Sequence, residues 1–203
     1  TYHITRILSG IFSNDVLSQN LALKGGTALN FIFLDIPRLS VDLDLNFIGA
    51  GEKEEMLAKR PRVMERICEL ARSMGYEISK KPGSYIMERM LLKYERLSGL
   101  TDSVRLEINY LERVPFVKII RRFFRHPFEM ETFDVNTYTI EEIAAMKLKA
   151  MAERLYARDI YDAYRIARMK TKNILLRKLM ILYLLMTGKR AEIKTLAFMA
   201  VSY

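Results

Sequence analysis

The sequence predicts an α+β protein in which a mixed sheet flanked by helices is followed by a helical domain. Apolar and polar residues alternate over Val41–Phe47 and again over Ser103–Tyr110, which is the pattern of half-buried strands. The last third of the chain instead carries apolar residues at helical spacing. We therefore divide the chain into residues 1–135, which mix strands and helices, and residues 136–203, which form a helical domain.

The N-terminal elements are read from periodicity and from glycine and proline. Residues Ile4–Leu17 predict an amphipathic helix, and Leu21–Lys24 predict a short strand that ends at the pair Gly25–Gly26. Thr27 is expected to open a second helix that reaches Leu34. Pro37 closes that helix, because proline disfavours helical backbone in the residue before it.

The middle of the chain predicts one more helix and a pair of strands. We expect Pro61 to break a helix or to start one near Arg60, with Gly75 as its C-cap. Residues Met87–Arg96 predict a strand that turns at Ser98–Gly99 into the strand Ser103–Tyr110.

The helical domain begins with a recognisable signal. Thr139-Ile140-Glu141-Glu142 fits a capping box, which starts a helix. Two further helices are expected over Arg158–Met169 and Asn173–Met186. The chain begins with Thr1 rather than Met and ends in the apolar stretch TLAFMAVSY, so we expect the helical domain to be truncated at its C-terminus.

Composition narrows the choice of partners and compartment. The net charge of +9 favours phosphate-rich partners such as nucleotides or RNA, or an acidic protein. Cys68 is the only cysteine, which suits a reducing cytoplasm, and two histidines argue against a zinc site. No signal peptide is visible, and the most apolar run, Ile174–Met186, contains two basic residues and is too short to cross a membrane.

Asp42 and Asp44 lie two apart on the alternating strand Val41–Phe47, so both carboxylates project from one face. A solvated edge strand would explain the pattern, although aspartate is depleted in strands. A calcium loop fails, because Phe47 and Lys53 stand where that loop needs glycine and glutamate. A third explanation is a divalent-metal site for phosphoryl or nucleotidyl transfer.

The glycine pair favours the third explanation. Gly25-Gly26-Thr27 stands between a short strand and a helix start, where glycine lets a triphosphate approach the backbone and the free amides bind anions. Neither a G-x-x-x-x-G-K-[ST] loop nor a G-x-G-x-x-G motif is present.

Four stretches taken together, LKGGTAL, PRLSVDLDL, RLEINY and EEIAAMKLKAMAERLYARDIYDAY, resemble the AbiEii nucleotidyltransferase toxin family of bacteria and archaea. This family belongs to the DNA polymerase β-like nucleotidyltransferase superfamily, and the resemblance covers roughly residues 21–165. It implies a nucleotidyltransferase-like sheet domain before the helical domain. It also implies a toxin with an antitoxin partner, which uses a nucleoside triphosphate with Mg²⁺ or Mn²⁺. Some related toxins add nucleotides to the 3′ end of tRNA.

The resemblance also assigns roles to residues. It implies a metal-binding pair that is also catalytic, Asp42 and Asp44, and further catalytic residues Glu107, Lys147 and Asp159. Asp159 lies in an R-D-x-x-D motif with Arg158 and Asp162, for which a helix-surface ion pair between Arg158 and Asp162 is the simpler explanation. The nucleotide-binding residues that it implies are Lys24, Gly25, Gly26, Thr27, Arg38 and Ser40.

A basic–aromatic segment comes before the helical domain. In this segment the basic residues Arg121, Arg122 and Arg125 are interleaved with the aromatic residues Phe123, Phe124 and His126. Such a segment suits RNA or an acidic antitoxin, and it equally suits a loop whose phenylalanines belong to the core. Three functions stay open at this point: nucleotide transfer to RNA, transfer to a protein or small molecule, and nucleotide binding without turnover.

Overall fold

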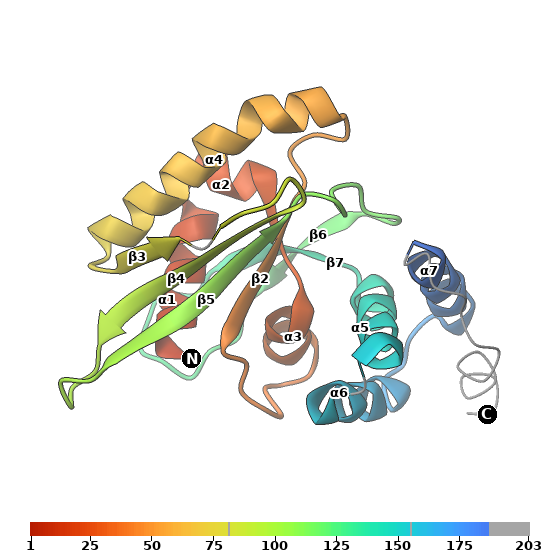
Figure 1. The fold of residues 1–203 in the computed structure, drawn as a ribbon. Coiled ribbons are helices and arrows are strands. Elements are labelled where there is room, and N and C mark those ends of the chain that lie inside the picture. Colours follow the sequence, from red (N-terminus) through yellow and green to blue (C-terminus); the bar gives the residue numbers. More distant parts are fainter. Residues whose placement is uncertain (81, 155, 187–203) are drawn as a thin grey trace. The chain divides into compact units, whose positions relative to one another are not determined.

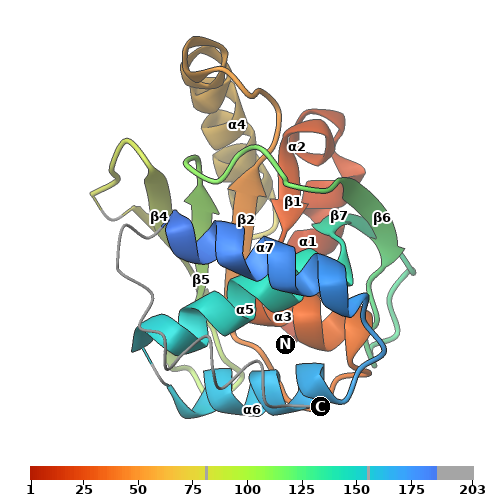
Figure 2. The ribbon, with the colours of Figure 1, turned by 90° about the vertical axis from the view of Figure 1, so that its right-hand side faces the viewer.

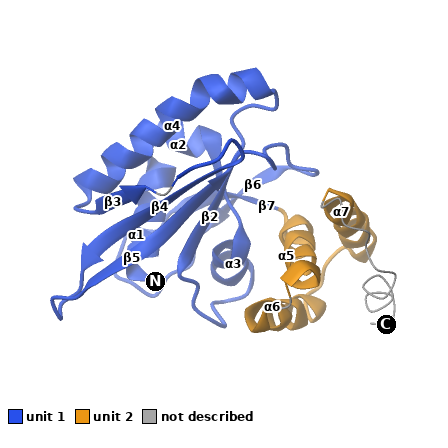
Figure 3. Cartoon of the chain, in the orientation of Figure 1, with its two compact units in different colours: residues 1–138 blue, residues 139–203 orange. Residues whose placement is uncertain are grey.

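The computed structural model describes residues 1–80, 82–154 and 156–186. The chain divides into two compact units, Thr1–Tyr138 and Thr139–Tyr203, which Figure 3 shows in different colours. The architecture confirms the predicted α+β class, with a mixed sheet and helices in unit 1 and helices in unit 2.

Unit 1 is built on a sheet of seven strands within the described residues, in the order β3-β4-β5-β2-β1-β7-β6. Its central pairs β2·β5 and β1·β7 are parallel, and the other pairs are antiparallel. The strands are β1 (Leu21–Leu23), β2 (Asp42–Phe47), β3 (Glu77–Lys80), β4 (Met87–Glu95), β5 (Thr101–Asn109), β6 (Ile119–Phe123) and β7 (Asp134–Tyr138).

Helices cover the sheet unequally. Figure 1 shows α1, α2 and α4 on one face, while α3 lies on the other. Leu43, Leu45 and Phe47 are completely buried along β2, and all three residues of β1 are buried as well. The helices of unit 1 are α1 (Tyr2–Ser13), α2 (Asp15–Asn20), α3 (Gly25–Ala28) and α4 (Lys53–Ser73), and a π-helical segment (Leu29–Phe33) follows α3.

Three expected helix boundaries in unit 1 are wrong. The single helix Ile4–Leu17 is two helices, because Asn14 has extended backbone and its side chain accepts a hydrogen bond from the Leu17 amide to begin α2. The helix after the glycine pair starts at Gly25 rather than Thr27, and its continuation is π-helical.

Pro61 neither starts nor breaks a helix, because it lies inside α4. Its ring is on the exposed side of the helix, while Met56, Val63 and Ile67 on either side of it are buried. Burial of this apolar stripe outweighs the one backbone hydrogen bond that proline cannot donate.

Unit 2 contains α5 (Ile140–Arg154), α6 (Ala157–Ala167) and α7 (Asn173–Leu185). Helix α5 packs against both others and lies between them in the view of Figure 2. One of the two hydrogen bonds of the expected capping box is present, from the Glu142 amide to the Thr139 hydroxyl. The Glu142 carboxylate accepts a hydrogen bond from the Tyr183 hydroxyl at 3.0 Å, which ties α5 to α7. None of the described helices is long and apolar enough to span a membrane.

Candidate active site

The turn after β1 lies directly against the carboxylate of Asp44. Gly25 has φ +72°, a backbone conformation that glycine adopts without steric cost. A Cβ atom on Gly25 would lie 2.1 Å from Asp44 Oδ2, which is far inside any normal contact. The Lys24 amide donates to the Asp44 carbonyl at 2.9 Å, so the backbone holds the turn beside β2. The glycine is therefore required both by the turn and by the nearby carboxylate.

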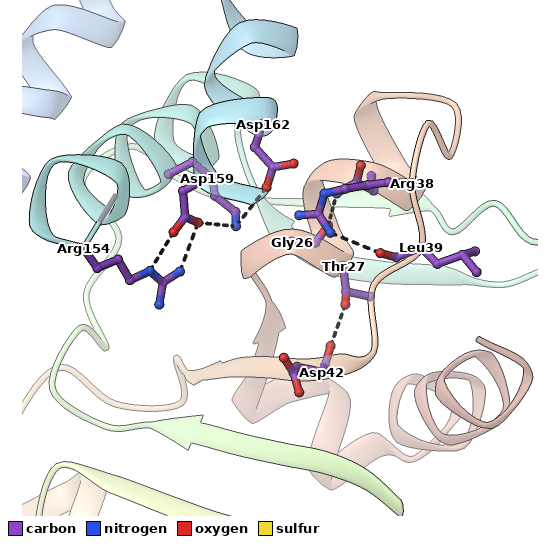
Figure 4. Close-up of polar contacts among 10 residues, drawn as sticks. Gly26, Thr27, Arg38, Leu39, Asp42, Arg154, Asp159 and Asp162 are labelled. Carbon is purple, nitrogen blue, oxygen red and sulfur yellow. Dashed lines mark hydrogen bonds and ion pairs between the residues drawn. The ribbon is translucent and has the colours of Figure 1, made fainter. Parts of the chain in front are cut away.

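Buried side-chain hydrogen bonds fix the turn. The Thr27 hydroxyl donates to the Asp42 carbonyl at 2.6 Å, a contact drawn in Figure 4. The Asn30 amide group donates to the Gly26 carbonyl at 2.8 Å, and both Thr27 and Asn30 are fully buried. Asn30 lies in the π-helical segment, a deviation that occurs often at functional sites.

Asp42 and Asp44 share one face of β2, as alternation predicts. In the parallel pairing of β2 with β5, Asp42 lies opposite Arg105 and Asp44 lies opposite Glu107. Arg105 Nη1 is 3.8 Å from Asp42 Oδ1. Glu107 therefore lies on the same face as the aspartate pair, but its Oε1 atom is 3.2 Å from Arg89 Nε on β4.

The aspartate pair fits a divalent cation that takes its other ligands from a substrate. Among the described residues, no three His, Cys, Asp or Glu side chains gather closely enough to hold a metal ion by themselves. Mg²⁺ needs only one or two protein carboxylates where phosphate and water supply the remaining oxygens. The absence of a side chain at Gly25 lets the Asp44 carboxylate lie directly against the backbone of the turn. Carboxylates supply the hard oxygen donors that Mg²⁺ and Mn²⁺ prefer.

The segment between α3 and β2 carries backbone strain. Asp35 and Ile36 have φ of 45° and 52°, which is unusual for a residue with a side chain and most of all for β-branched Ile36. The Ile36 amide donates to the Asn30 carbonyl at 2.9 Å, which anchors the strained turn to the π-helical segment. Arg38 and Ser40 follow on this segment, and Arg38 Nη1 donates to the Leu39 carbonyl at 3.1 Å.

Lys24 has a partner that sequence reasoning missed. Its Nζ atom donates to Glu112 Oε2 at 3.0 Å, with both side chains mostly buried. The two residues are 88 positions apart in the sequence, so no local pattern signals the pair. Arg89 and Arg105, on the same sheet face as the aspartates, were missed for the same reason.

Unit 2 contains its own charged cluster around Lys147 of α5. Lys147 Nζ lies 3.0 Å from Asp162 Oδ2 and 3.6 Å from Asp159 Oδ1 on α6. The Arg154 guanidinium donates to both carboxylate oxygens of Asp159, at 2.7 and 3.1 Å, as Figure 4 shows. Asp159 and Asp162 are completely buried. Asp162 is therefore a buried carboxylate that pairs with Lys147 of α5.

Electrostatics favour the ionised form of Asp159. Burial alone would raise the pKa of this carboxyl, because a low dielectric penalises charge. The hydrogen bonds from Arg154 and the nearby positive charges of Lys147, Arg154 and Arg158 outweigh burial, and the pKa is lowered. The surrounding positive groups therefore hold Asp159 in its carboxylate form.

The basic–aromatic segment begins in strand β6, which ends at Phe123, and continues as a loop over Phe124–His126. Arg121 and Arg122 are exposed on β6, an edge strand of the sheet. Phe123 is 47% exposed, whereas Phe124 is buried and stacks on Phe31 with ring centroids 5.1 Å apart. One phenylalanine thus belongs to the core, and the other remains on the surface beside the arginines.

One protein family matches nearly the whole chain. The family described as "Nucleotidyl transferase AbiEii toxin, Type IV TA system" matches residues 6–200. No curated protein sequence matches the chain.

Several solved structures share the fold. The nucleotidyltransferase toxin MenT4 from Mycobacterium tuberculosis is 22% identical with a TM-score of 0.64, over 89% of this chain and 62% of that chain. The chain thus spans less than two thirds of the length of MenT4. JHP933 from Helicobacter pylori is 18% identical with a TM-score of 0.60, over 99% of this chain and 88% of that one. An antigenic nucleotidyltransferase-like protein from Paracoccidioides brasiliensis is 16% identical with a TM-score of 0.51, over 91% and 89%.

Proposed function

The chain belongs to the AbiEii family of nucleotidyltransferase toxins, and on that premise we propose that it transfers a nucleotide from a nucleoside triphosphate to an RNA acceptor such as the 3′ end of tRNA. An acceptor hydroxyl attacks the α-phosphorus, a new phosphodiester bond forms, and pyrophosphate leaves. The observation that supports this proposal most strongly is the contact between the glycine turn and Asp44, which places a bare backbone beside a carboxylate pair.

Each part of unit 1 has a role in the proposal. Asp42 and Asp44 hold Mg²⁺ or Mn²⁺, and the turn Gly25–Thr27 holds the triphosphate, with Lys24 donating to a phosphate. A bound divalent cation supplies charge neutralisation for the phosphates and orients them for in-line attack. Thr27 and Asn30 keep the turn rigid, so that its backbone amides are oriented before the nucleotide arrives.

The remaining site residues are assigned by the family resemblance. Arg38 and Ser40 contact the nucleotide from the strained segment before β2. Glu107 lies on the face of the aspartate pair and accepts the proton of the attacking hydroxyl, once Arg89 gives up its contact with this carboxylate. Lys147 is catalytic, and Asp159, whose Oδ1 atom lies 3.6 Å from Lys147 Nζ, takes part with it.

The net charge of the chain and its family support the choice of acceptor and of the other partners. A net charge of +9 and the exposed arginines of β6 beside Phe123 suit an RNA strand, through phosphate contacts and base stacking. The family name supports an antitoxin partner. A cytoplasmic location completes the proposal, because nucleoside triphosphates and tRNA are found there and a lone cysteine suits a reducing compartment.

The test is a transfer assay with each labelled nucleoside triphosphate and total tRNA. We expect label in RNA from the unmodified protein, and a loss of at least about 100-fold for Asp44→Ala, because the phosphates lose their charge stabilisation. Asp102→Ala is the control, since Asp102 is on β5 but pairs with Arg96.

The other outcomes separate the alternatives. Label in a protein or small molecule would replace RNA as the acceptor class. Nucleotide binding without any labelled product would indicate a binding protein. Full transfer by a folded Asp44→Ala protein would refute the assignment of the metal pair.

A further inference from the structure

The ion pair between Lys24 and Glu112 lies at the edge of the glycine turn. Lys24 is the last residue before Gly25, and its ammonium group is 3.0 Å from the Glu112 carboxylate. The two side chains are 17% and 15% exposed. A charge-assisted hydrogen bond in such a sheltered position is stronger than a surface ion pair, because water screens it less.

The peptide that carries Glu112 is fixed by two asparagines. Asn109, the last residue of β5, accepts hydrogen bonds at its Oδ1 atom from the amides of Leu111 and Glu112, at 2.8 and 3.0 Å. This is the turn that an asparagine side chain forms with its own backbone. The Asn46 side chain donates to the Glu112 carbonyl at 2.9 Å, and Asn46 is itself completely buried.

The pair lies on the same sheet face as the proposed metal ligands. The Lys24 amide bonds to the Asp44 carbonyl, which places Lys24 beside Asp44 in the strand pairing. Asn46 is two residues beyond Asp44 on β2, so its side chain projects from the same face and reaches Glu112 there. An ammonium group has three N–H donors, so a bond to Glu112 is compatible with a further bond to a phosphate.

We propose that Glu112 is a positioning residue that orients the Lys24 ammonium group for the triphosphate. This inference rests on the proposed function. A flexible lysine loses rotamer freedom when it binds a phosphate. Because Glu112 already orders the side chain, the nucleotide binds with a smaller entropy loss. Glu112 thus acts through Lys24 and lowers the KM for nucleotide.

Charge alone would predict that Glu112 raises the KM for nucleotide, because a carboxylate near a phosphate repels it. The fixed peptide favours positioning instead. Three side-chain hydrogen bonds hold the backbone at Leu111 and Glu112, and the carboxylate is mostly buried. A carboxylate that competed with the nucleotide would have to withdraw from Lys24, which this enclosure disfavours.

The test measures KM and kcat for the nucleoside triphosphate in the full chain. Glu112→Gln keeps the side-chain shape and removes the charge, and we expect KM to rise roughly tenfold with kcat changed less than about twofold. The matched control is Glu88→Gln. It removes an ion pair of similar burial, Arg60 Nη2 to Glu88 Oε1 at 2.5 Å with 15% and 23% exposure, and should leave KM unchanged.

A double-mutant cycle with Lys24→Met separates positioning from general damage. If Glu112 acts through Lys24, Glu112→Gln raises KM no further in the Lys24→Met background. Glu112→Asp, which keeps the charge but shortens the reach, should give an intermediate KM and serves if Glu112→Gln fails to fold.

Two results would overturn the inference while the proposed function stands: an active Glu112→Gln protein with unchanged or lower KM, or additive effects in the cycle. If the unmodified protein neither binds nor transfers nucleotide, the proposed function fails, and the positioning role fails with it.

Discussion

Two pairs of aspartates, one in each unit, occupy opposite environments. Asp42 and Asp44 lie two apart on a strand, on a face where both side chains remain partly accessible. Asp159 and Asp162 lie three apart on a helix and are completely buried, with Lys147 contacting both. The same residue type therefore occurs in two different chemical environments. An accessible pair next to a bare backbone can bind a ligand, whereas a buried pair held by its own cations stabilises the packing of two helices.

The difference changes how mutations should be interpreted. Loss of activity at Asp44 would report mainly on the proposed chemistry, because this side chain is only partly buried. Loss of activity after mutation of Lys147 or Asp159 would reflect both chemistry and stability, since removing one member leaves a buried charge without its counter-ion.

The two aspartate pairs should differ most in how far mutation at each one lowers the stability of the fold. Lys147→Met should cost about 3–5 kcal/mol of unfolding free energy, because Asp159 and Asp162 lose a buried counter-ion. Asp44→Asn should change it by less than about 1 kcal/mol. The chain has no tryptophan, so urea unfolding is followed by far-UV circular dichroism. Equal losses for the two variants would remove the distinction between the aspartate pairs.

A smaller change in the free energy of unfolding is expected when the pH is lowered. The pKa of Asp159 is lower in the folded protein than in the unfolded chain, so the unfolded chain takes up this proton first as pH falls. The stabilisation is fully present above about pH 5 and is lost as pH falls below about 4 and through the folded pKa. Wild type should therefore lose more stability than Asp159→Asn between about pH 5 and pH 3. Parallel curves for the two proteins would contradict a lowered pKa for Asp159.

Local patterns were sufficient for much of the fold. Alternation located β2 and β5, the turn at Ser98–Gly99 helped to locate β4, and helical spacing located α5, α6 and α7. The short strands β3, β6 and β7 were not predicted, because their residues do not alternate and are arranged by pairing with distant strands. Pro61 misled the prediction because propensity is local, while the burial that overrides it is tertiary.

The candidate site could likewise be predicted only in part. The glycine pair and the aspartate pair could be read from the sequence, because each is a short motif with its own chemical logic. Their contact could not, since it depends on the antiparallel pairing of β1 with β2. Glu112 and Arg89 became visible only through strand register and the turn after β5.

The most direct test of the central claim compares two glycines with similar backbone strain. Gly25 and Gly75 have φ of +72° and +84°, but a Cβ atom would collide with Asp44 at Gly25 and would meet nothing within 4 Å at Gly75. Both alanine variants should lose about 1–2 kcal/mol of stability from the strain.

Nucleotide transfer is then measured for folded Gly25→Ala and Gly75→Ala. The account predicts wild-type transfer for Gly75→Ala and a loss of at least about 100-fold for Gly25→Ala, since the added methyl group displaces the Asp44 carboxylate. Equal transfer by the two variants would contradict the claim that the turn and the aspartate pair form one site.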